Sequence, residues 1–581
     1  KVIDGLQLVG QAVIRKYDQD ENVTNKKIIN YDWDNNEVRE KRTPNSAERR
    51  YQKTLSKNFT LYADYKKNFN DRHDLSVMVG TSHESENYDR FTAKRINFDQ
   101  QENMSLQLGS AQDQNAWSEG NQWTINSFFS RVNYTFANKY VIEGTIRADG
   151  SSRFDPDHRW GWFPGVNAAW RVGEEGFMKR LGWFEDLKVR ASYGEMGNQS
   201  GIGLYDYIQL ISLSNDYYPF GAGVKGQMAT SGNIISTSRT WETIQTTNVG
   251  FDFSTLNNRL YGSFDYFWKE NKNMLIPKTY PSMLGADAPS TNSGHLSIHG
   301  WEISLGWRDQ IKDFSYSVRF NISDAKNKVV DRVGSNLIQL GNNETPTGYP
   351  LNSYFGYEFD GIIQNEQELE AYKSRFSEGG IPGDLSVGDA MYKDLDGDGK
   401  LSVLGDGKEG SGDVKYLGDK NPRYNFGFNL SMAWKGFDLS AFIQGVGRRT
   451  MFLEGESRCP MPEAWYQSAE YWYGKTWTPE RTDAQYPAIT LKDKRNYNYY
   501  VSTNTKFNVA YARLKNLQFG YTIPQTLTSK AGLQKVRVYF SGEDLFEVHN
   551  TPNGWDPEEN SGSITSYPFT RNYSFGINVV F

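Results

Sequence analysis

An acidic segment late in the chain has the residue types and spacing of a cation site. Asp394, Asp396 and Asp398 stand at alternate positions in YKDLDGDGK and are followed by Gly399. A calcium loop places oxygen ligands at its first, third and fifth positions and a glycine at the sixth, where the chain turns sharply. The twelfth position holds a glycine, and Asp406 follows it. The segment predicts either a Ca²⁺ or Mg²⁺ site formed by these four aspartates or an Asp-Gly turn that only stiffens the loop.

The histidines do not indicate a metal or catalytic centre. His295 and His299 have the spacing of a helical metal pair. In an extended segment, however, four residues at about 3.3 Å each separate the two imidazoles by about 13 Å, too far for one ion. GEMGNQSGIG lacks the helix that a phosphate-binding loop requires. No serine, cysteine or carboxylate pattern suggests a triad around the other histidines, which are His73, His83, His158 and His549. We predict no enzymatic activity.

Aromatic residues gather in two stretches between the expected strands, 216–221 and 464–477. Flat rings at an exposed mouth can stack on sugars or cover a partner protein, because they bury much area at low entropic cost. The alternative is that the rings pack the loops internally. The candidate substrate or partner contacts are Tyr217, Tyr218, Phe220, Trp465, Tyr466, Tyr471, Trp472 and Trp477.

The end of the chain alternates apolar and small or polar residues. Tyr573, Phe575, Ile577, Val579 and Phe581 occupy every second position, which predicts a strand with one apolar face. A strand that faces lipid needs no polar cover, although a half-buried strand of a soluble sandwich would share the pattern. In a membrane barrel the last strand must pair to close the sheet, so we expect Phe581 to be needed for assembly.

The clearest hairpin is NPRYNFGFNLSMAWKGFDLSAFIQG, in which 424–434 and 437–443 alternate around a Lys435-Gly436 turn. Eleven alternating residues match the ~9–11 of a membrane strand rather than the ~5–6 of a soluble one. The opposite face carries Asn, Ser and Gly, as a water-filled or plugged lumen allows. Further strands are expected at 5–17, 55–69, 123–136, 140–148, 249–253, 260–268, 301–307 and 314–322.

Short turns and long spacers alternate between the strands, which is typical of outer-membrane barrels. The long spacers are expected at 195–240, 273–297, 329–349, 364–420, 448–506 and 548–566, and a polar loop at 18–50. We expect about sixteen or seventeen strands. One helix is expected, at 364–376, inside a long spacer.

The composition agrees with such a barrel. Aromatic residues make up 15% of the 581 residues, there are 54 glycines, and the mean hydropathy is -0.70. No run approaches the ~18–20 apolar residues of a transmembrane helix, whereas alternating barrel strands look hydrophilic on average. The net charge of -6 implies neither nucleic acid nor an anionic surface as partner. The single cysteine, Cys459, cannot form an internal disulfide.

Several ordered motifs together resemble the SusC/RagA family of TonB-dependent outer-membrane transporters, over essentially all of residues 1–581. They include RADGSSRF with RWGWFP, VRASYGEMGNQ, WETIQTTNVGFDF with NNRLYGSFDYF, YFGYEFDGI, YKDLDGDGK, YARLKNLQFGYTIP and VYFSGEDLF. The resemblance implies an all-β fold, a transmembrane antiparallel β-barrel of 22 strands with long extracellular loops. The family's N-terminal plug, its TonB-contact segment and the first strands have no counterpart in this sequence.

The resemblance also implies a function in the outer membrane of a Gram-negative bacterium. That function is active import of oligosaccharides or peptides with a SusD-like surface lipoprotein as lid and with energy supplied through TonB. We expect the protein to contact outer-membrane lipid and to have no nucleic-acid partner. A passive porin or secretion barrel would share the strand pattern, and a soluble glycan-binding β protein would share the aromatic residues.

Overall fold

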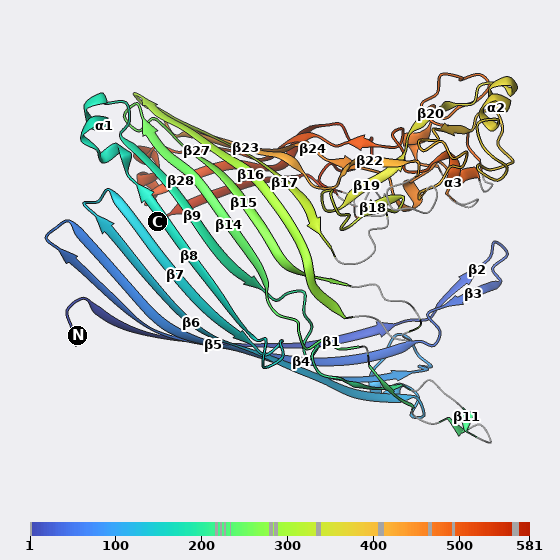
Figure 1. The fold of residues 1–581 in the computed structure, drawn as a ribbon, viewed down its shortest axis with the longest axis horizontal. Coiled ribbons are helices and arrows are strands. Elements are labelled where there is room, and N and C mark those ends of the chain that lie inside the picture. The colour runs from blue at the N-terminus through green and yellow to red at the C-terminus, as the bar shows by residue number, and fades with distance from the viewer. Residues whose placement is uncertain are drawn as a thin grey trace. The chain divides into compact units, whose positions relative to one another are not determined.

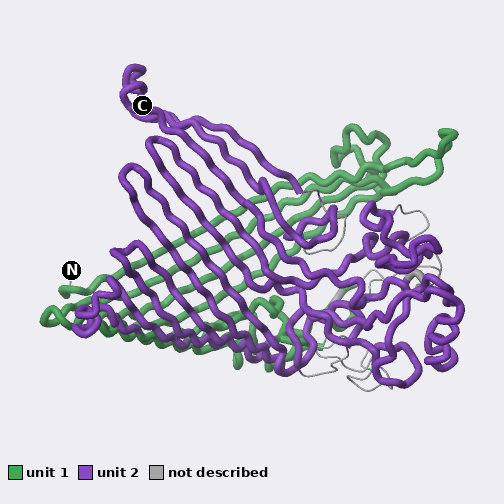
Figure 2. The backbone as a smooth tube through the Cα atoms, turned by 90° about the horizontal axis from the view of Figure 1, so that it is seen from above, with its two compact units in different colours: residues 1–168, 194–244, 275–292 green, residues 169–193, 245–274, 293–581 purple. Residues whose placement is uncertain are grey.

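The computed structural model describes residues 3–214, 219–220, 224–225, 228–232, 234–277, 283, 289–332, 338–404, 412–462, 468–490, 494–559, 567 and 569–581 (Figure 1). The chain divides into two compact units (Figure 2). Unit 1 comprises residues 1–168, 194–244 and 275–292, and unit 2 comprises residues 169–193, 245–274 and 293–581.

The described residues form one large sheet of 16 strands whose order follows the chain. This agrees with the strand number expected from the sequence. The strands are β1 (Leu6–Asn25), β4 (Ser46–Phe69), β5 (His73–Ile96), β6 (Gln114–Phe136), β7 (Tyr140–Ser151), β8 (Trp160–Trp170), β9 (Asp186–Asn198), β14 (Glu242–Thr255), β15 (Leu260–Pro277), β16 (Ser290–Ile311), β17 (Phe314–Asp331), β23 (Arg423–Trp434), β24 (Phe437–Arg448), β27 (Tyr511–Thr522), β28 (Lys535–His549) and β29 (Asn572–Val580).

Smaller elements occupy the long connections. The short strands pair as β2 (Ile28–Tyr31) with β3 (Glu37–Lys41), β10 (Ile211–Ser214) with β13 (Met228–Ser231), β11 (Pro219–Phe220) with β12 (Val224–Lys225), β18 (Gly341–Asn343) with β19 (Ser353–Tyr357) and β22 (Val414–Asp419), β20 (Phe359–Ile362) with β21 (Ala390–Tyr392), and β25 (Thr450–Met451) with β26 (Phe507–Asn508). The α-helices are α1 (Gly176–Leu181), α2 (Glu366–Lys373), α3 (Lys494–Asn498) and α4 (Gln525–Thr528). None of the helices in the described ranges is long and apolar enough to cross a membrane.

The strands of unit 1 are longer than their sequence pattern predicts. β4 and β5 pair without a shift from Ser46↔Ile96 to Phe69↔His73. Each has 24 residues, about twice the ~9–11 of a membrane crossing. The polar loop expected at 18–50 was therefore partly wrong. Opposite charges on neighbouring strands replace the apolar alternation there, as in the pair between Arg49 Nη2 and Asp20 Oδ2 at 2.6 Å.

Hairpins of unit 2 fold as the alternation predicts. β23 and β24 pair from Trp434↔Phe437 upward, around Lys435 (φ 47°) and Gly436 (φ 91°). A turn with two positive φ values matches the twist of antiparallel strands, and glycine adopts the second at no steric penalty. The registers place Phe437 and Tyr521 on one face, with ring centroids 4.5 Å apart. The other face carries Ser317, Ser431 and similar small polar residues.

Two buried cores of unit 2 lie in its long connections, 332–422 and 449–510, with Trp555 of the β28–β29 connection, at the opposite end of the sheet from α1 (Figure 1). The helix predicted at 364–376 is confirmed as α2. Its N-cap Asn365 accepts the Glu368 N–H at 2.9 Å, and Glu368 Oε2 accepts the Gln364 N–H at 2.6 Å. The first bond satisfies one free donor of the first turn, and the second ties the residue before the N-cap to the helix.

Candidate functional site

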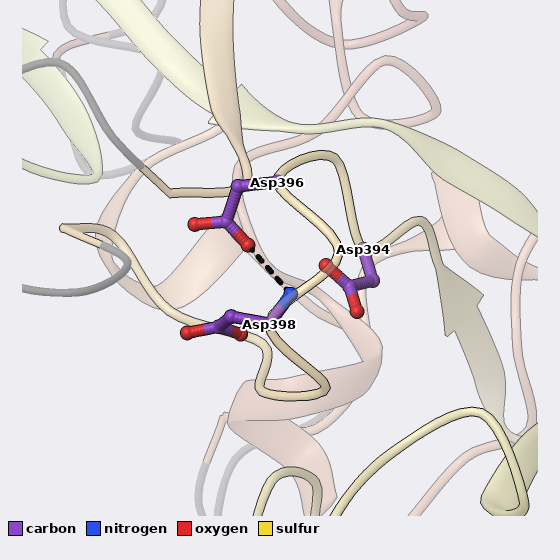
Figure 3. A group of neighbouring side chains, drawn as sticks. All are labelled: Asp394, Asp396 and Asp398. Carbon is purple, nitrogen blue, oxygen red and sulfur yellow. Dashed lines mark hydrogen bonds between the residues drawn. The ribbon is translucent and has the colours of Figure 1, made fainter.

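The acidic loop brings three of its four predicted carboxylates together (Figure 3). Asp394, Asp396 and Asp398 each offer a carboxylate oxygen, and these oxygens lie within 4.8 Å of one another. Asp398 and Asp396 are exposed and Asp394 is half-buried. Asp406 lies outside the described residues. Three converging carboxylates fit a hard cation, which takes oxygen ligands.

Backbone donors shape the loop around these carboxylates. Asp394 accepts the Gly397 N–H at 2.6 Å through Oδ1 and the Gly399 N–H at 2.9 Å through Oδ2. Both glycines have a φ of 75°, which the sharp turn requires. Asp396 Oδ1 accepts the Asp398 N–H at 3.2 Å. The three side chains retain acceptor capacity beyond these bonds.

A buried carboxylate that the sequence motif does not include fixes both ends of the acidic loop. Asp413 is fully buried, and it accepts the Leu395 N–H at 2.6 Å and the Ser402 N–H at 2.8 Å. Burial raises the pKa of Asp413, and the nearby charges of Asp396 and Asp394 raise it further. No spacing rule could have singled it out, because it lies 15 residues beyond Asp398 in the sequence, outside the motif.

A second fastening holds the base of the same loop. Glu358 accepts hydrogen bonds from Lys393, at 2.7 Å, and from Lys415. These two bonds lower the pKa of Glu358 to about 2. The ion pairs join the strand that enters the acidic loop to the segment that leaves it.

The loop rests on a core of tyrosines that comes from distant parts of the chain. Tyr372 and Tyr497 share a hydrogen bond between their hydroxyls at 2.8 Å, and the Tyr392 hydroxyl donates to the Tyr497 carbonyl at 2.8 Å. Burial raises the pKa of Tyr392 well above its ordinary value. These phenols are therefore neutral and act as structural donors and acceptors.

The predicted aromatic contacts have three different outcomes. Tyr471, Trp472 and Trp477 are buried. Tyr471 and Trp472 pack with Tyr486 and Trp555, as the packing interpretation expects. Phe220 lies in β11, where the structure describes no side chain. The remaining predicted contacts lie outside the described residues, namely Tyr217, Tyr218, Trp465 and Tyr466.

The ligand contacts of all these rings stay predictions. Sequence reasoning did not select Tyr473 as a contact, although its side chain is 90% exposed directly after the buried Tyr471 and Trp472. No sequence signal separates Tyr473 from the two buried aromatic residues that precede it.

The paired histidines lie in a strand. His295 and His299 both belong to β16, and His295 Nε2 lies 2.6 Å from Glu270 Oε2 on the neighbouring strand. The extended spacing puts the two imidazoles too far apart for one ion. Phe581 follows directly on β29 and is largely exposed.

The polar face of the sheet in unit 2 carries a hollow near the short turns. Its volume is about 670 Å³. Hydroxyl and charged groups contribute to its lining, among them Ser315, Ser317, Ser431, Ser440, Arg259 and Asp438. Hydrophilic groups on this face and rings on the other are what a barrel with a wet lumen and a lipid-facing exterior needs.

Comparisons with known proteins agree with this fold. Residues 11–545 match the family model described as TonB dependent receptor-like, beta-barrel. TonB-dependent receptor P3 of Formosa agariphila is 32% identical over 558 residues, which cover 91% of this chain and 52% of the relative. TonB-dependent receptor SusC of Bacteroides thetaiotaomicron is 26% identical over 568 residues, covering 90% and 50%.

A solved structure of the RagAB peptide transporter superposes with a TM-score of 0.79 at 24% identity, covering 100% of this chain and 60% of that one. The chain spans about half the length of the curated relatives it matches. The barrel family to which these proteins belong resides in the outer membrane. The chain belongs to the TonB-dependent receptors, in the SusC/RagA family, and has their β-barrel fold.

Proposed function

We propose that this chain forms the barrel of an active importer in the outer membrane of a Gram-negative bacterium. Its cargo would be oligosaccharides or peptides, and it would work with a SusD-like surface lipoprotein and with energy supplied through TonB. The observation that carries the proposal is membership of the SusC/RagA family over most of the chain. The peptide class follows from a neighbour whose structure is that of a peptide transporter, and the oligosaccharide class is what the family resemblance implies.

The geometry of the chain suits this function. The polar face of the sheet offers hydroxyl, amide and paired charged groups to a hydrophilic cargo, as in Arg190, which donates to Asp265 Oδ2 at 2.7 Å and to Asp252 Oδ1 at 3.1 Å. The loop cores of unit 2 supply a built structure at the end of the sheet where the long connections lie. Long loops of outer-membrane barrels lie on the extracellular side.

The experiment that tests the function measures uptake in the native host. A strain that lacks the gene should lose uptake of one labelled cargo class, oligosaccharide or peptide, and complementation should restore it. The same uptake should stop when TonB is removed, because active import needs the energy input. Uptake that persists without TonB would show a passive porin instead, and export in place of uptake would show a secretion barrel.

A further inference from the structure

The connection between β8 and β9, residues 171–185, differs from the tight β14–β15, β16–β17 and β23–β24 turns at the same end of the sheet. It contains the helix α1, and Phe177 and Leu181 of that helix are 49% and 50% exposed. Residues four apart lie on one helix face, whereas Lys179 lies on another. The helix ends at Gly182, and the next residue, Trp183, is 66% exposed. The connection therefore exposes three apolar side chains within residues 177–183, namely Phe177, Leu181 and Trp183, which we call the patch.

This patch is held in place by hydrogen bonds. The Thr255 hydroxyl donates to the Trp183 carbonyl at 2.5 Å. Glu185 accepts the Asn257 N–H at 2.7 Å, and its own N–H donates to the Ser254 carbonyl at 2.9 Å. A helix of six residues is marginal by itself in water. The hydrogen bonds to the β14–β15 turn fix the backbone of this connection, and so they hold the three apolar side chains in their exposed positions.

The patch continues the apolar outer face of the sheet. Phe184 packs on Phe253 with ring centroids 6.4 Å apart, and Phe253 lies 6.2 Å from Phe251. Phe251 and Val249 alternate with the inward Asp252 and are exposed. In a transmembrane barrel that outer face contacts lipid. The bilayer therefore covers Phe251. Because the patch lies next to this outer face, the same bilayer contacts the patch.

Basic side chains border the patch. Lys179 and Arg180 are exposed, and Lys179 Nζ lies 2.6 Å from Glu174 Oε2. Exposed ion pairs are weak, so Lys179 can exchange this partner for another anion. Apolar side chains on one face with lysine and arginine beside them are typical of segments that lie in the membrane interface.

We propose that residues 176–183 form an interfacial anchor on the short-turn rim of the barrel. Phe177, Leu181 and Trp183 enter the boundary between headgroups and acyl chains, and Lys179 and Arg180 bind the phosphates of anionic phospholipids. The anchor fixes the height and tilt of this rim in the bilayer. It requires the transmembrane barrel but does not depend on what the protein transports.

Spin labels test the depth of the segment in reconstituted protein. Trp183→Cys and Phe177→Cys are labelled separately, and Tyr473→Cys, at a 90% exposed position of a long loop, is the matched water-exposed control. The wild-type chain has only Cys459, which is buried, so its labelling gives the background. In bilayers we expect the ratio of oxygen to nickel-chelate collisions to be several-fold higher at 183 and 177 than at 473. Ratios at 183 and 177 equal to that at 473 would overturn the proposal and show a patch that is open to water or waits for a protein.

The headgroup part is tested by bilayer composition. Adding phosphatidylglycerol to phosphatidylcholine should move the label at 177 or 183 deeper, because anionic headgroups attract Lys179 and Arg180. The double variant Lys179→Gln with Arg180→Gln should lose that dependence while keeping the heat-modifiable migration of a folded barrel. A dependence on phosphatidylglycerol that survives in the double variant would overturn the assignment of the two basic residues.

Discussion

Asp396 is the acidic-loop residue best suited to a metal test. We propose that Asp394, Asp396 and Asp398 hold Ca²⁺ or Mg²⁺, because their carboxylate oxygens converge. Asp394 also shapes the turn through two backbone bonds, so its removal would confuse shape with binding. Asp396→Ala should lose the Ca²⁺-dependent protection of segment 391–413 from protease while the barrel stays folded.

The control for this test is Asp384→Ala, which removes an exposed carboxylate of the same long connection outside the cluster. It should keep the protection that Ca²⁺ gives. If the wild-type segment is cleaved equally with Ca²⁺ and with chelator, the motif is only a turn, as the alternative interpretation of the sequence holds.

Glu358 makes the stability of the long connection depend on pH. Its pKa is lowered to about 2 by the hydrogen bonds from Lys393 and Lys415. A carboxyl with a lowered pKa stabilises the fold above its ordinary pKa of about 4.3. That contribution is lost as the pH falls from there to about 2. The loop of the wild type should therefore open progressively as the pH falls across this range, and faster pepsin cleavage would detect the opening.

The matched variant for this pH effect is Glu358→Gln, which cannot ionise. It should be cleaved somewhat faster than the wild type near pH 5 and should show a smaller change down to about pH 2, because the group that titrates is absent. Identical pH profiles of the two proteins would assign the acid response to other carboxyls.

Residue roles were only partly predictable from the sequence. The alternate aspartates converge because their spacing is that of a tight turn, and Gly397 and Gly399 adopt the positive φ values that this turn needs. Asp413 and Glu358 act through contacts that only the folded chain brings about, between segments that no local pattern links. Tyr471 and Trp472 show the same limit, since packing and ligand contact favour the same residue types in a sequence.

At the scale of elements, two buried arginines secure the connection between β28 and β29. Arg513 of β27 is fully buried, lies 2.7 Å from Asp556 and 3.2 Å from Glu558, and stacks on Phe569 at 4.2 Å. Arg449 donates to the Pro557 and Glu559 carbonyls at 2.9 and 2.8 Å. Residues 550–559 are thus held from two sides.

Arg513→Met should release this connection. Asp556 then loses its buried cation, which costs up to about 3–5 kcal/mol, whereas Glu558 keeps its pair with Lys515 at 3.1 Å. Hydrogen exchange of residues 550–559 should accelerate strongly while exchange in β27 stays slow. Arg49→Met is the control, since it breaks the exposed pair with Asp20 and should change little. Unchanged exchange at 550–559 in Arg513→Met would show that the charges do not hold the connection.

β29 supplies the last strand of the sheet and a row of outward apolar residues. It pairs with β28 from Lys535↔Val580 to Glu543↔Asn572, and Phe575 and Ile577 are largely exposed. Deleting residues 573–581 leaves the backbone groups of β28 without partners in lipid, where each unsatisfied group costs several kcal/mol. Folding yield, measured as heat-modifiable barrel in membranes, should fall sharply.

Phe581 can be tested apart from the strand. Phe581→Ala should lower the yield by a smaller amount, whereas Ser574→Ala, on the opposite face, should leave it unchanged. Normal recovery of inserted barrel after deletion of 573–581 would show that assembly does not depend on this strand.

Strand prediction succeeded where alternation was strong and failed where polar residues extend a strand. The hairpin at 423–448 follows directly from its alternating residues and from Lys435-Gly436. The end of β1, the start of β4 and the end of β5 carry charged residues on both faces, so these parts show no alternation of apolar and polar residues. They are strands because the register that begins in the apolar half continues and places opposite charges side by side, as at Arg49 and Asp20.

At the scale of the whole molecule, the family resemblance predicted the barrel, which the alternation of individual strands could not distinguish from a soluble sandwich. Alternation alone left a soluble sandwich open, since a single half-buried strand has the same period. The ordered motifs removed this ambiguity, and the family model matches residues 11–545. The cargo and the partner remain proposals, because they depend on loop surfaces whose sequences serve packing and binding alike.

The last prediction concerns the proposed lipoprotein lid. Contacts between lasting partners bury more than about 2,000 Å² and are rich in aromatic and apolar residues. The 195–240 loop exposes Ile208, Leu210, Ile211 and Leu213, and the 448–506 loop exposes Tyr473. We expect these exposed side chains, rather than the buried Trp472, to contact the lid. Replacing the four aliphatic residues with serine, or Tyr473 with alanine, should each reduce the lipoprotein that co-purifies with the barrel.

Both variants should keep the heat-modifiable migration of the folded barrel, because the changed side chains are exposed and add little to its stability. Trp472→Ala is the contrasting variant. It leaves a cavity in the core formed with Tyr486 and Tyr499, so it should loosen the loop itself, which protease cleavage would detect. Co-purification that stays unchanged in both surface variants would place the lid contact elsewhere, or show that this barrel works without a lid.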